Sequence, residues 1–204
     1  MKKPIKLFVI MDKSGSMNGV RQETVTGIQE YLQSLKKDKN QYEVTLTLFD
    51  TVVEKIRDAE NLDTMAELKD SEYRPEGMTA LLDAVGLTIE GAMKTVKKTD
   101  KCLVVIMTDG MENSSKEYTG KTIAKLVKEL EAKGNWTFTF MGANQDSWHT
   151  AQNMGFGNKG NTMNYTPSGA GTRVAFDTLA RSTGFYAQSA SMSVDNFYED
   201  NKDA

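Results

Sequence analysis

The amino-acid sequence predicts an α/β domain with an open, mostly parallel sheet. Two short stretches, residues 5–11 and 102–107, are almost entirely apolar. Such stretches are typical of strands that are buried on both faces, as in a parallel sheet. Apolar residues at helical spacing lie between the predicted strands. Strands that alternate with helices favour right-handed crossovers and helices on both faces of the sheet.

The first half of the chain begins with the first of these buried strands. A helix is expected between residues 20 and 37, where apolar side chains recur at helical spacing. Residues 42–49 alternate between apolar and polar side chains, which predicts a half-buried strand. Residues 52–56 are expected to pair with that strand as a hairpin. The polar segment 57–78 is expected to be irregular, with one helical turn at 65–68.

The second half repeats the alternation of helices and strands. A helical stripe of apolar residues at 82–96 precedes the second buried strand. Gly134 is expected to end the helix that follows, because glycine adopts the left-handed conformation of many helix ends. The remaining predicted elements are a helix at 123–130, a strand at 136–142, a short helix at 147–154, an edge strand at 162–165 and a last helix at 172–187.

Length and composition predict one globular domain. A chain of 204 residues with 39% hydrophobic and 26% charged residues is ordinary for such a domain. We expect a single domain at 1–190 and a loose, acidic and polar tail at 191–204. A net charge of −3 argues against a broad basic surface for binding nucleic acid.

Cysteine and histidine are each represented once. Cys102 alone allows no intramolecular disulfide and no cysteine-rich zinc site, and His149 alone allows no histidine-paired metal cage. The apolar stretch behind the N-terminus is too short for an export signal or a membrane span. We therefore expect a cytoplasmic protein that binds neither membranes nor nucleic acid.

Oxygen-bearing side chains follow both buried strands. Asp12, Ser14 and Ser16 come directly after the first strand, and Asp109 follows the second. Thr79 stands just before a predicted helix. Ligands of open α/β sheets bind beyond the carboxyl ends of the central strands, so these five side chains are expected to converge. Carboxylates and hydroxyls are hard donors that suit Mg²⁺, Mn²⁺ or Ca²⁺.

Three segments carry a resemblance to a known family. Residues 12–17 (DKSGSM), 77–84 (GMTALLDA) and 108–110 (TDG) resemble the three loops of the von Willebrand factor A domain. These loops form that family's metal-ion-dependent adhesion site. Asp12, Ser14 and Ser16 match its D-x-S-x-S loop, Thr79 its threonine and Asp109 its second aspartate. The resemblance extends over residues 4–190, and no ligand position is missing.

The resemblance implies both a fold and a function. It implies a Rossmann-like sheet of order 3-2-1-4-5-6 with one antiparallel strand. It also implies a bound divalent ion, in first place Mg²⁺, that captures an exposed Asp or Glu of a partner protein. The chain is most similar to the small, free-standing versions found in bacteria and their phages. We expect a monomer or weak self-association, without enzymatic activity.

Two other functions remain open from the sequence. The first alternative is a structural or assembly subunit of a larger particle, which differs from the binding module mainly in its partner and stoichiometry. A metal-dependent phosphohydrolase is the third reading, because acids at the carboxyl ends of a parallel sheet also occur there. Against it, the second position after Asp12 is Ser14 instead of an acid, and no phosphate-binding glycine-rich loop is present.

Several further residues have two interpretations. The Asp83 carboxylate is expected either to stabilise the helix N-terminus electrostatically or to support the metal site without binding the ion itself. Residues 144–146 (NQD) are expected to form a turn and helix cap instead of a partner contact, and Trp148 and His149 to be packing residues. A more speculative interpretation makes Met17 and Met111 an apolar rim. The lysines from 94 to 101 are expected to be a solvated helix end.

Overall fold

The computed structural model describes residues 3–143 and 146–198. It contains one six-stranded sheet in the order β3-β2-β1-β4-β5-β6, which confirms the predicted order. β2 and β3 pair antiparallel, and every other neighbouring pair is parallel. The strands are β1 (Ile5–Asp12), β2 (Tyr42–Phe49), β3 (Val53–Asn61), β4 (Cys102–Thr108), β5 (Trp136–Ala143) and β6 (Thr162–Tyr165).

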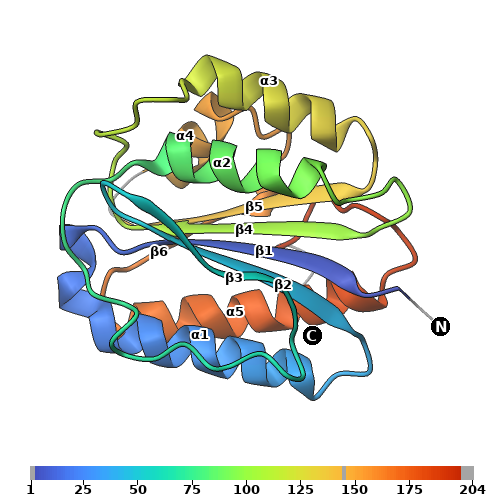
Figure 1. Cartoon of the computed structure of the whole chain (residues 1–204), viewed down its shortest axis with the longest axis horizontal. Helices are drawn as coiled ribbons and strands as arrows, with labels where there is room; N and C mark the ends of the chain where they lie inside the picture. The colour runs from blue at the N-terminus through green and yellow to red at the C-terminus, as the bar shows by residue number, and fades with distance from the viewer. Residues whose placement is uncertain (1–2, 144–145, 199–204) are drawn as a thin grey trace.

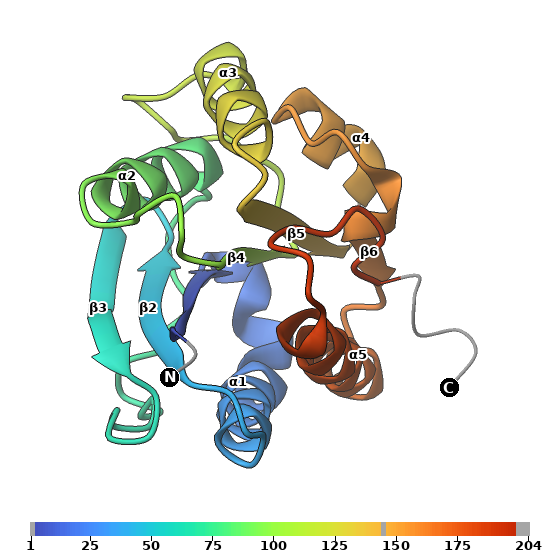
Figure 2. The same cartoon turned by 90° about the vertical axis from the view of Figure 1, so that its right-hand side faces the viewer.

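Helices cover both faces of the sheet (Figures 1 and 2). α1 and α5 lie on one face, and α2, α3 and α4 on the other. Each face has its own apolar core, with α1 and α5 in one and α2 to α4 in the other. The helices are α1 (Arg21–Lys36), α2 (Leu81–Met93), α3 (Gly120–Glu131), α4 (Ser147–Asn153) and α5 (Gly169–Gln188), with short 3-10 helices η1 (Gly15–Val20) and η2 (Lys159–Asn161). Within the described ranges, no helix is long and apolar enough to cross a membrane.

The two central strands are the two apolar stretches of the sequence. β4 is buried along its whole length, and β1 along all but Lys6. They lie in register, with Lys6 opposite Cys102 and Met11 opposite Met107. Because the strands are parallel and aligned, the residues that follow them emerge at the same end of the sheet. This alignment positions the predicted site.

The chain after the first hairpin differs from the prediction. β3 extends to Asn61, although most of its side chains are polar, because one of its edges is unpaired and its outer side chains remain in solvent. No helical turn forms at 65–68. Met65 and Leu68 are nevertheless buried in the core beside α1, so apolar contacts hold this segment without helical hydrogen bonds. α2 ends at Met93, before the predicted end at 96.

The segment predicted to be a loose tail is partly packed. The structure describes it as far as residue 198, and Phe197 and Tyr198 are buried in the core beside α5. The Phe197 N–H donates to Asn161 Oδ1 at 2.9 Å, and the Tyr198 N–H donates to Gly160 O at 2.9 Å. The two aromatic residues in this otherwise acidic segment were therefore the sequence feature that indicated packing against the domain. The domain boundary at 190 stays a prediction, and residues 199–204 lie outside the described residues.

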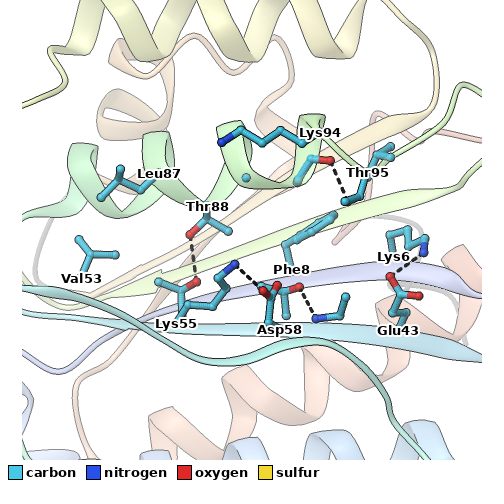
Figure 3. A pocket seen from close by; sticks show the side chains of 16 residues that line it. Lys6, Phe8, Glu43, Val53, Lys55, Asp58, Leu87, Thr88, Lys94 and Thr95 are labelled. Atoms are coloured by element: carbon cyan, nitrogen blue, oxygen red, sulfur yellow. Dashed lines mark hydrogen bonds and ion pairs between the residues drawn. The ribbon is translucent and has the colours of Figure 1, made fainter.

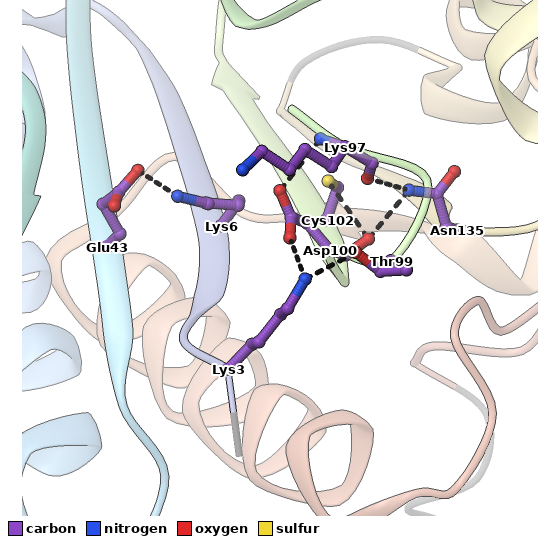
Figure 4. Close-up of polar contacts among 8 residues, drawn as sticks. All are labelled: Lys3, Lys6, Glu43, Lys97, Thr99, Asp100, Cys102 and Asn135. Atoms are coloured by element: carbon purple, nitrogen blue, oxygen red, sulfur yellow. Dashed lines mark hydrogen bonds and ion pairs between the residues drawn. The ribbon is translucent and has the colours of Figure 1, made fainter. Parts of the chain in front are cut away.

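The sheet end opposite the predicted site is tied together by polar contacts (Figure 4). The Asp100 carboxylate accepts from the Lys97 N–H at 2.9 Å and pairs with Lys3 at 3.5 Å. Lys101 does not belong to a solvated helix end, since its ammonium group donates to the carbonyls of Tyr186 (2.5 Å) and Ser189 (2.9 Å) at the end of α5. The negative end of the helix dipole stabilises a cation at this position.

Cys102 is a core residue, as expected. Its side chain is fully buried, and burial raises the pKa of the thiol to about 12. The thiol therefore stays protonated and unreactive at neutral pH.

Candidate metal centre

Three loops meet at the end of the sheet where β1 and β4 finish (Figure 1). Asp12 is the last residue of β1, and Asp109 directly follows β4. Thr79 lies in the loop that leads into α2. The first and second loops are joined through their backbones, since the Gly15 N–H donates to Gly77 O at 3.2 Å. Parallel strands and loop hydrogen bonds therefore bring distant segments to one place.

The five predicted ligand residues surround Gly110. The Ser14 and Ser16 hydroxyl oxygens are 3.1 Å apart, and the Ser16 hydroxyl donates to Asp109 Oδ1 at 2.5 Å. A methyl group added to Gly110 would lie 2.8 Å from Thr79 Oγ1, 3.4 Å from Asp12 Oδ2 and 3.5 Å from Ser16 Oγ. A side chain at this position would therefore project into the space between these oxygen atoms, which glycine leaves open. The structure brings together all five residues: Asp12, Ser14, Ser16, Thr79 and Asp109.

Both carboxylates of the site are buried without a cationic partner. Asp12 is fully buried and Asp109 is 7% exposed. Burial raises the pKa of both, against hydrogen bonds from Thr108 to Asp12 and from Ser16 to Asp109. Among the described residues, no Lys or Arg forms an ion pair with either acid. Buried carboxylates need a cation, so the site is short of positive charge.

Lys13 is the nearest lysine in the sequence, and it turns away from the site. Its ammonium group lies 2.5 Å from Asp50 Oδ2 and 3.0 Å from Glu54 Oε2. Although burial opposes its charge, these two carboxylates hold the pKa of Lys13 above its usual value. Lys13 therefore does not occupy the predicted metal position.

Two tyrosines of the site were missed in the sequence. The Tyr73 hydroxyl donates to Asp12 O at 2.5 Å and fixes the end of β1 from below the loop. The buried Tyr165 hydroxyl has no hydrogen-bond partner among the described residues. Tyr165 is the last residue of β6, at the same end of the sheet as the site; burial raises its pKa first of all, and the charges of Asp109 and Asp12 raise it further. Neither tyrosine had a sequence signal, because their segments lie far from the three motif loops.

The donor set fits a hard divalent cation. Two carboxylates balance the charge of the ion, and three hydroxyls add neutral oxygen ligands. All five side chains offer oxygen atoms, whereas zinc and copper sites use mainly histidine and cysteine ligands.

The loop after Asp109 is latched to the Thr79 loop. The Thr79 N–H donates to Asn113 Oδ1 at 2.9 Å, and the Asn113 N–H donates back to Thr79 O at 3.1 Å. The Glu112 carboxylate accepts from the Leu82 N–H at the start of α2 (3.0 Å) and from the Ser115 N–H (2.8 Å). These bonds make the second and third metal loops one unit, which holds Thr79 and Asp109 at a fixed separation.

Asp83 lies in the first turn of α2, as predicted for an acid that favours the helix N-terminus, and its carboxylate also extends this latch. Its carboxylate accepts three backbone N–H bonds, from Lys116 (2.8 Å), Glu117 (2.9 Å) and Tyr118 (2.9 Å). Asp83 therefore ties the α2 helix to the segment before α3. Its contribution to the site passes through the third loop, and no contact with the five predicted ligand residues is recorded.

The remaining residues of this rim divide into supported and revised interpretations. Asp146 caps α4 as predicted, since its side chain accepts from the His149 N–H at 3.0 Å; Asn144 and Gln145 lie outside the described residues. His149 is exposed and lines a groove of about 310 Å³ beside Met111, so it is not a packing residue. Met17 is fully buried and cannot form a rim, whereas Met111 is 74% exposed.

The chain belongs to the von Willebrand factor type A domain family, whose model matches residues 7–173. The match covers most of the chain and contains all three loops of the site. A comparison with curated protein sequences found no match.

Solved structures of several von Willebrand-type proteins share the fold. The von Willebrand domain of the type V pili tip protein Mfa5 from Porphyromonas gingivalis has a TM-score of 0.69 at 12% identity, over 94% of this chain and 98% of that domain. The pilus adhesin SpaC from Lactobacillus rhamnosus GG has a TM-score of 0.71 at 12% identity, over 91% of this chain and 30% of that one. Manganese-loaded TRAP protein from Plasmodium vivax has a TM-score of 0.57 at 16% identity, over 85% and 73%. At these identities the likeness concerns the fold alone.

Proposed function

We propose that this chain is a divalent-metal-dependent protein-binding module that captures an acidic side chain of a partner protein. The observation that carries the proposal is the meeting of two buried carboxylates, which form no ion pair with a described Lys or Arg, with three hydroxyls at the end of the sheet. Family membership supports it, because adhesion proteins are among the structural neighbours. One neighbour was solved with manganese bound.

Each of the five side chains has a defined part in the proposal. Asp12 and Asp109 would hold the ion and balance its charge, and Ser14, Ser16 and Thr79 would add neutral oxygens. Mg²⁺ is the first candidate, with Mn²⁺ and Ca²⁺ as alternatives. When bound, such an ion supplies a positive point charge that attracts a carboxylate from outside. The Thr108 hydroxyl donates to the Asp12 carboxylate and would keep it oriented, and the Tyr73 hydroxyl holds the Asp12 backbone through its carbonyl oxygen.

The partner's specificity would come from the surface around the ion. A single carboxylate contact buries little area, so most of the affinity must come from neighbouring side chains. Met78 and Met111 belong to the second and third loops and are 52% and 74% exposed. Flexible, exposed methionines next to a charged site suit an apolar side chain beside the partner's Asp or Glu.

We propose a binding role and not an enzymatic one. Catalysis would need a base or nucleophile positioned against the ion. His149 hydrogen-bonds through its backbone to Asp146 and lines the separate groove beside Met111, and Cys102 is a buried thiol. An assembly subunit remains the alternative within the same chemistry, with a second copy as the partner. The small bacterial or phage type and the cytoplasmic location stay predictions from the sequence.

A metal titration tests the first half of the proposal. Calorimetry with Mn²⁺ is expected to show one site in the wild type and no binding in Asp109→Asn. Asp177→Asn is the matched control, because Asp177 is an exposed acid on α5. Equal binding by wild type and Asp109→Asn would contradict the assignment of the site.

Partner capture tests the second half. Proteins crosslinked to the chain in the native host are expected to depend on Mg²⁺ and to disappear with EDTA or in Asp109→Asn. Asp177→Asn should retain them. Size-exclusion chromatography with and without Mg²⁺ then separates capture of another protein from self-assembly. Partners that persist unchanged in EDTA would exclude capture through the ion.

A further inference from the structure

A second concave site lies between α2 and the strands β2 and β3, of which β3 is the edge strand (Figure 3). It has a volume of about 460 Å³, and none of the five predicted metal ligands lines it. Phe8 of β1 forms part of its floor, and Leu87 and Thr88 of α2 form its opposite wall. This groove, the α2–β3 groove, falls within the 300–1,000 Å³ range of small-molecule sites.

The floor of the groove is polar where a core would be apolar. On the α1 side of β2, Val44, Leu46 and Leu48 are fully apolar and buried. On the α2 side, Thr45 and Thr47 are equally buried. The Thr88 hydroxyl of α2 donates to Thr47 Oγ1 at 3.0 Å. The sheet therefore meets α2 here through hydroxyls, which form a less complete apolar contact and leave space.

Small residues and a distorted strand keep this space open. Gly91 and Ala92 of α2 face the groove, and a methyl group added at Gly91 would meet no atom within 4 Å. β3 bulges opposite, with Ala59 in the left-handed region at φ 52°. That conformation is unfavourable for alanine, and the Ala59 N–H is bonded to Thr45 Oγ1 at 3.1 Å. A groove residue thus holds a strained rim in place, which is typical of binding sites.

The groove carries excess positive charge. Lys6 and Lys55 pair with Glu43 (2.5 Å) and Asp58 (2.7 Å), which also line it. Lys94, at the end of α2, is exposed and has no ion pair among the residues that the structure describes. Its ammonium group is therefore available to an anion.

We propose that the α2–β3 groove binds a small organic anion that carries an apolar body. The apolar body packs against Phe8, Leu87 and neighbouring apolar side chains, and the anionic group pairs with Lys94. A concave site of this size suits a small molecule, whereas an extended peptide would need a longer groove. The site is independent of the metal centre in residues and chemistry.

Naphthalene-2-sulfonate is a suitable probe, because it joins an anion to a flat apolar body. In an NMR titration in EDTA, shifts are expected at Phe8, Thr45, Thr88 and Ala92, with saturation at one equivalent. Gly91→Phe should reduce the affinity at least tenfold, because the ring projects into the open space. Gly184→Phe on α5 is the matched control, since an added methyl group there also meets no atom within 4 Å. Its affinity should equal that of the wild type.

The charge requirement is tested separately. Lys94→Gln should weaken sulfonate binding several-fold, while neutral 2-naphthalenemethanol binds the wild type and the variant equally weakly. Shifts around Met111 instead, or affinity unchanged in Gly91→Phe, would overturn the proposal. So would a change in the sedimentation of the ligand-free protein by Gly91→Phe, which would make the groove an interface between copies. Because EDTA is present throughout, failure here leaves the metal proposal untouched.

Discussion

Two groups of carboxylates lie next to each other in this molecule, and the chain gives a cation to only one of them. Asp50 and Glu54 are neutralised by Lys13. Asp12, Asp109 and Asp50 are all buried, with exposed fractions of 0%, 7% and 4%, but Asp12 and Asp109 have no ion pair within the described residues. Lys13 stands directly beside Asp12 in the sequence, so the difference does not reflect a lack of lysine nearby.

The difference teaches how the site is kept open. The Lys13 N–H donates to Phe49 O at 2.6 Å, which directs the lysine toward β2 and the hairpin. Because Lys13 pairs with Asp50 and Glu54, it does not neutralise Asp12 and Asp109, which therefore depend on an external ion. A buried charge without a partner is costly, so this arrangement indicates a binding site instead of a structural ion pair.

The largest expected effect comes from removing the internal cation. Lys13→Met leaves Asp50 buried without its partner and should lower the free energy of unfolding by about 3–5 kcal/mol. Lys6→Met is the control, because its partner Glu43 has a side chain that is 30% exposed. That change should cost at most about 1 kcal/mol. Denaturant unfolding measures both losses. Equal losses would show that the deeper burial of the Lys13–Asp50 pair does not make its removal more costly.

The next effect concerns the external cation. With a divalent ion at about 100 times its Kd, the wild type should gain about 2.7 kcal/mol of unfolding free energy. Asp109→Asn should abolish this gain, since it removes one of the two charged ligands. Thermal unfolding with Mg²⁺ and with EDTA measures it. A gain that survives in Asp109→Asn but disappears in Lys13→Met would place the ion at the other carboxylate pair.

A smaller effect is expected from the latch between the second and third loops. Asn113→Ala leaves the Thr79 N–H without its acceptor and loosens Thr79 against Asp109. Metal affinity should fall by about tenfold, a typical result for residues that orient ligands. Asn113→Asp keeps the acceptor oxygen and should restore most of the affinity. Calorimetry with Mn²⁺ reads the difference, and wild-type affinity in Asn113→Ala would remove the latch from the account.

The smallest effect separates a third carboxylate, Glu72, from the two groups. Arg57 donates to both its oxygens (2.8 and 3.1 Å) and lowers the pKa of Glu72. The stabilisation is therefore present above the unfolded pKa of roughly 4.3 and is lost as the pH falls through the lower folded value. Wild type should lose up to about 1 kcal/mol more than Glu72→Gln on acidification. If the unfolding free energies of the wild type and Glu72→Gln fell in parallel from pH 6 to pH 3, the Arg57–Glu72 ion pair would make no such contribution.

The fold was largely predictable, because its elements have strong local patterns. The strands β1 and β4 are uninterrupted apolar stretches, and β2 alternates strictly. The segment between the hairpin and α2 was less predictable. There Met65 and Leu68 reach the core from a loop, where no periodicity marks a buried side chain. Phe197 and Tyr198 were missed for the same reason.

The predicted site residues came from a motif, but their supports did not. D-x-S-x-S, the threonine and the second aspartate have fixed spacing within their own loops. The hydroxyls of Tyr73 and Tyr165 reach the site from segments whose distance in sequence says nothing about their distance in space. Asn113 and Glu112 also looked like ordinary loop residues, and only their bonds to Thr79 and α2 reveal the latch.

The sequence by itself determined the order of strands and helices and the family to which the chain belongs, and it predicted the five oxygen ligands that the structure brings together. Those properties depend on local periodicity and short motifs. Only the tertiary structure decided that Lys13 faces Asp50, that Asp83 holds the third loop, and that α2 leaves a groove above Thr45 and Thr47. The reason is physical: the direction of a side chain and the space beside it are set by packing between distant segments, which no local pattern encodes.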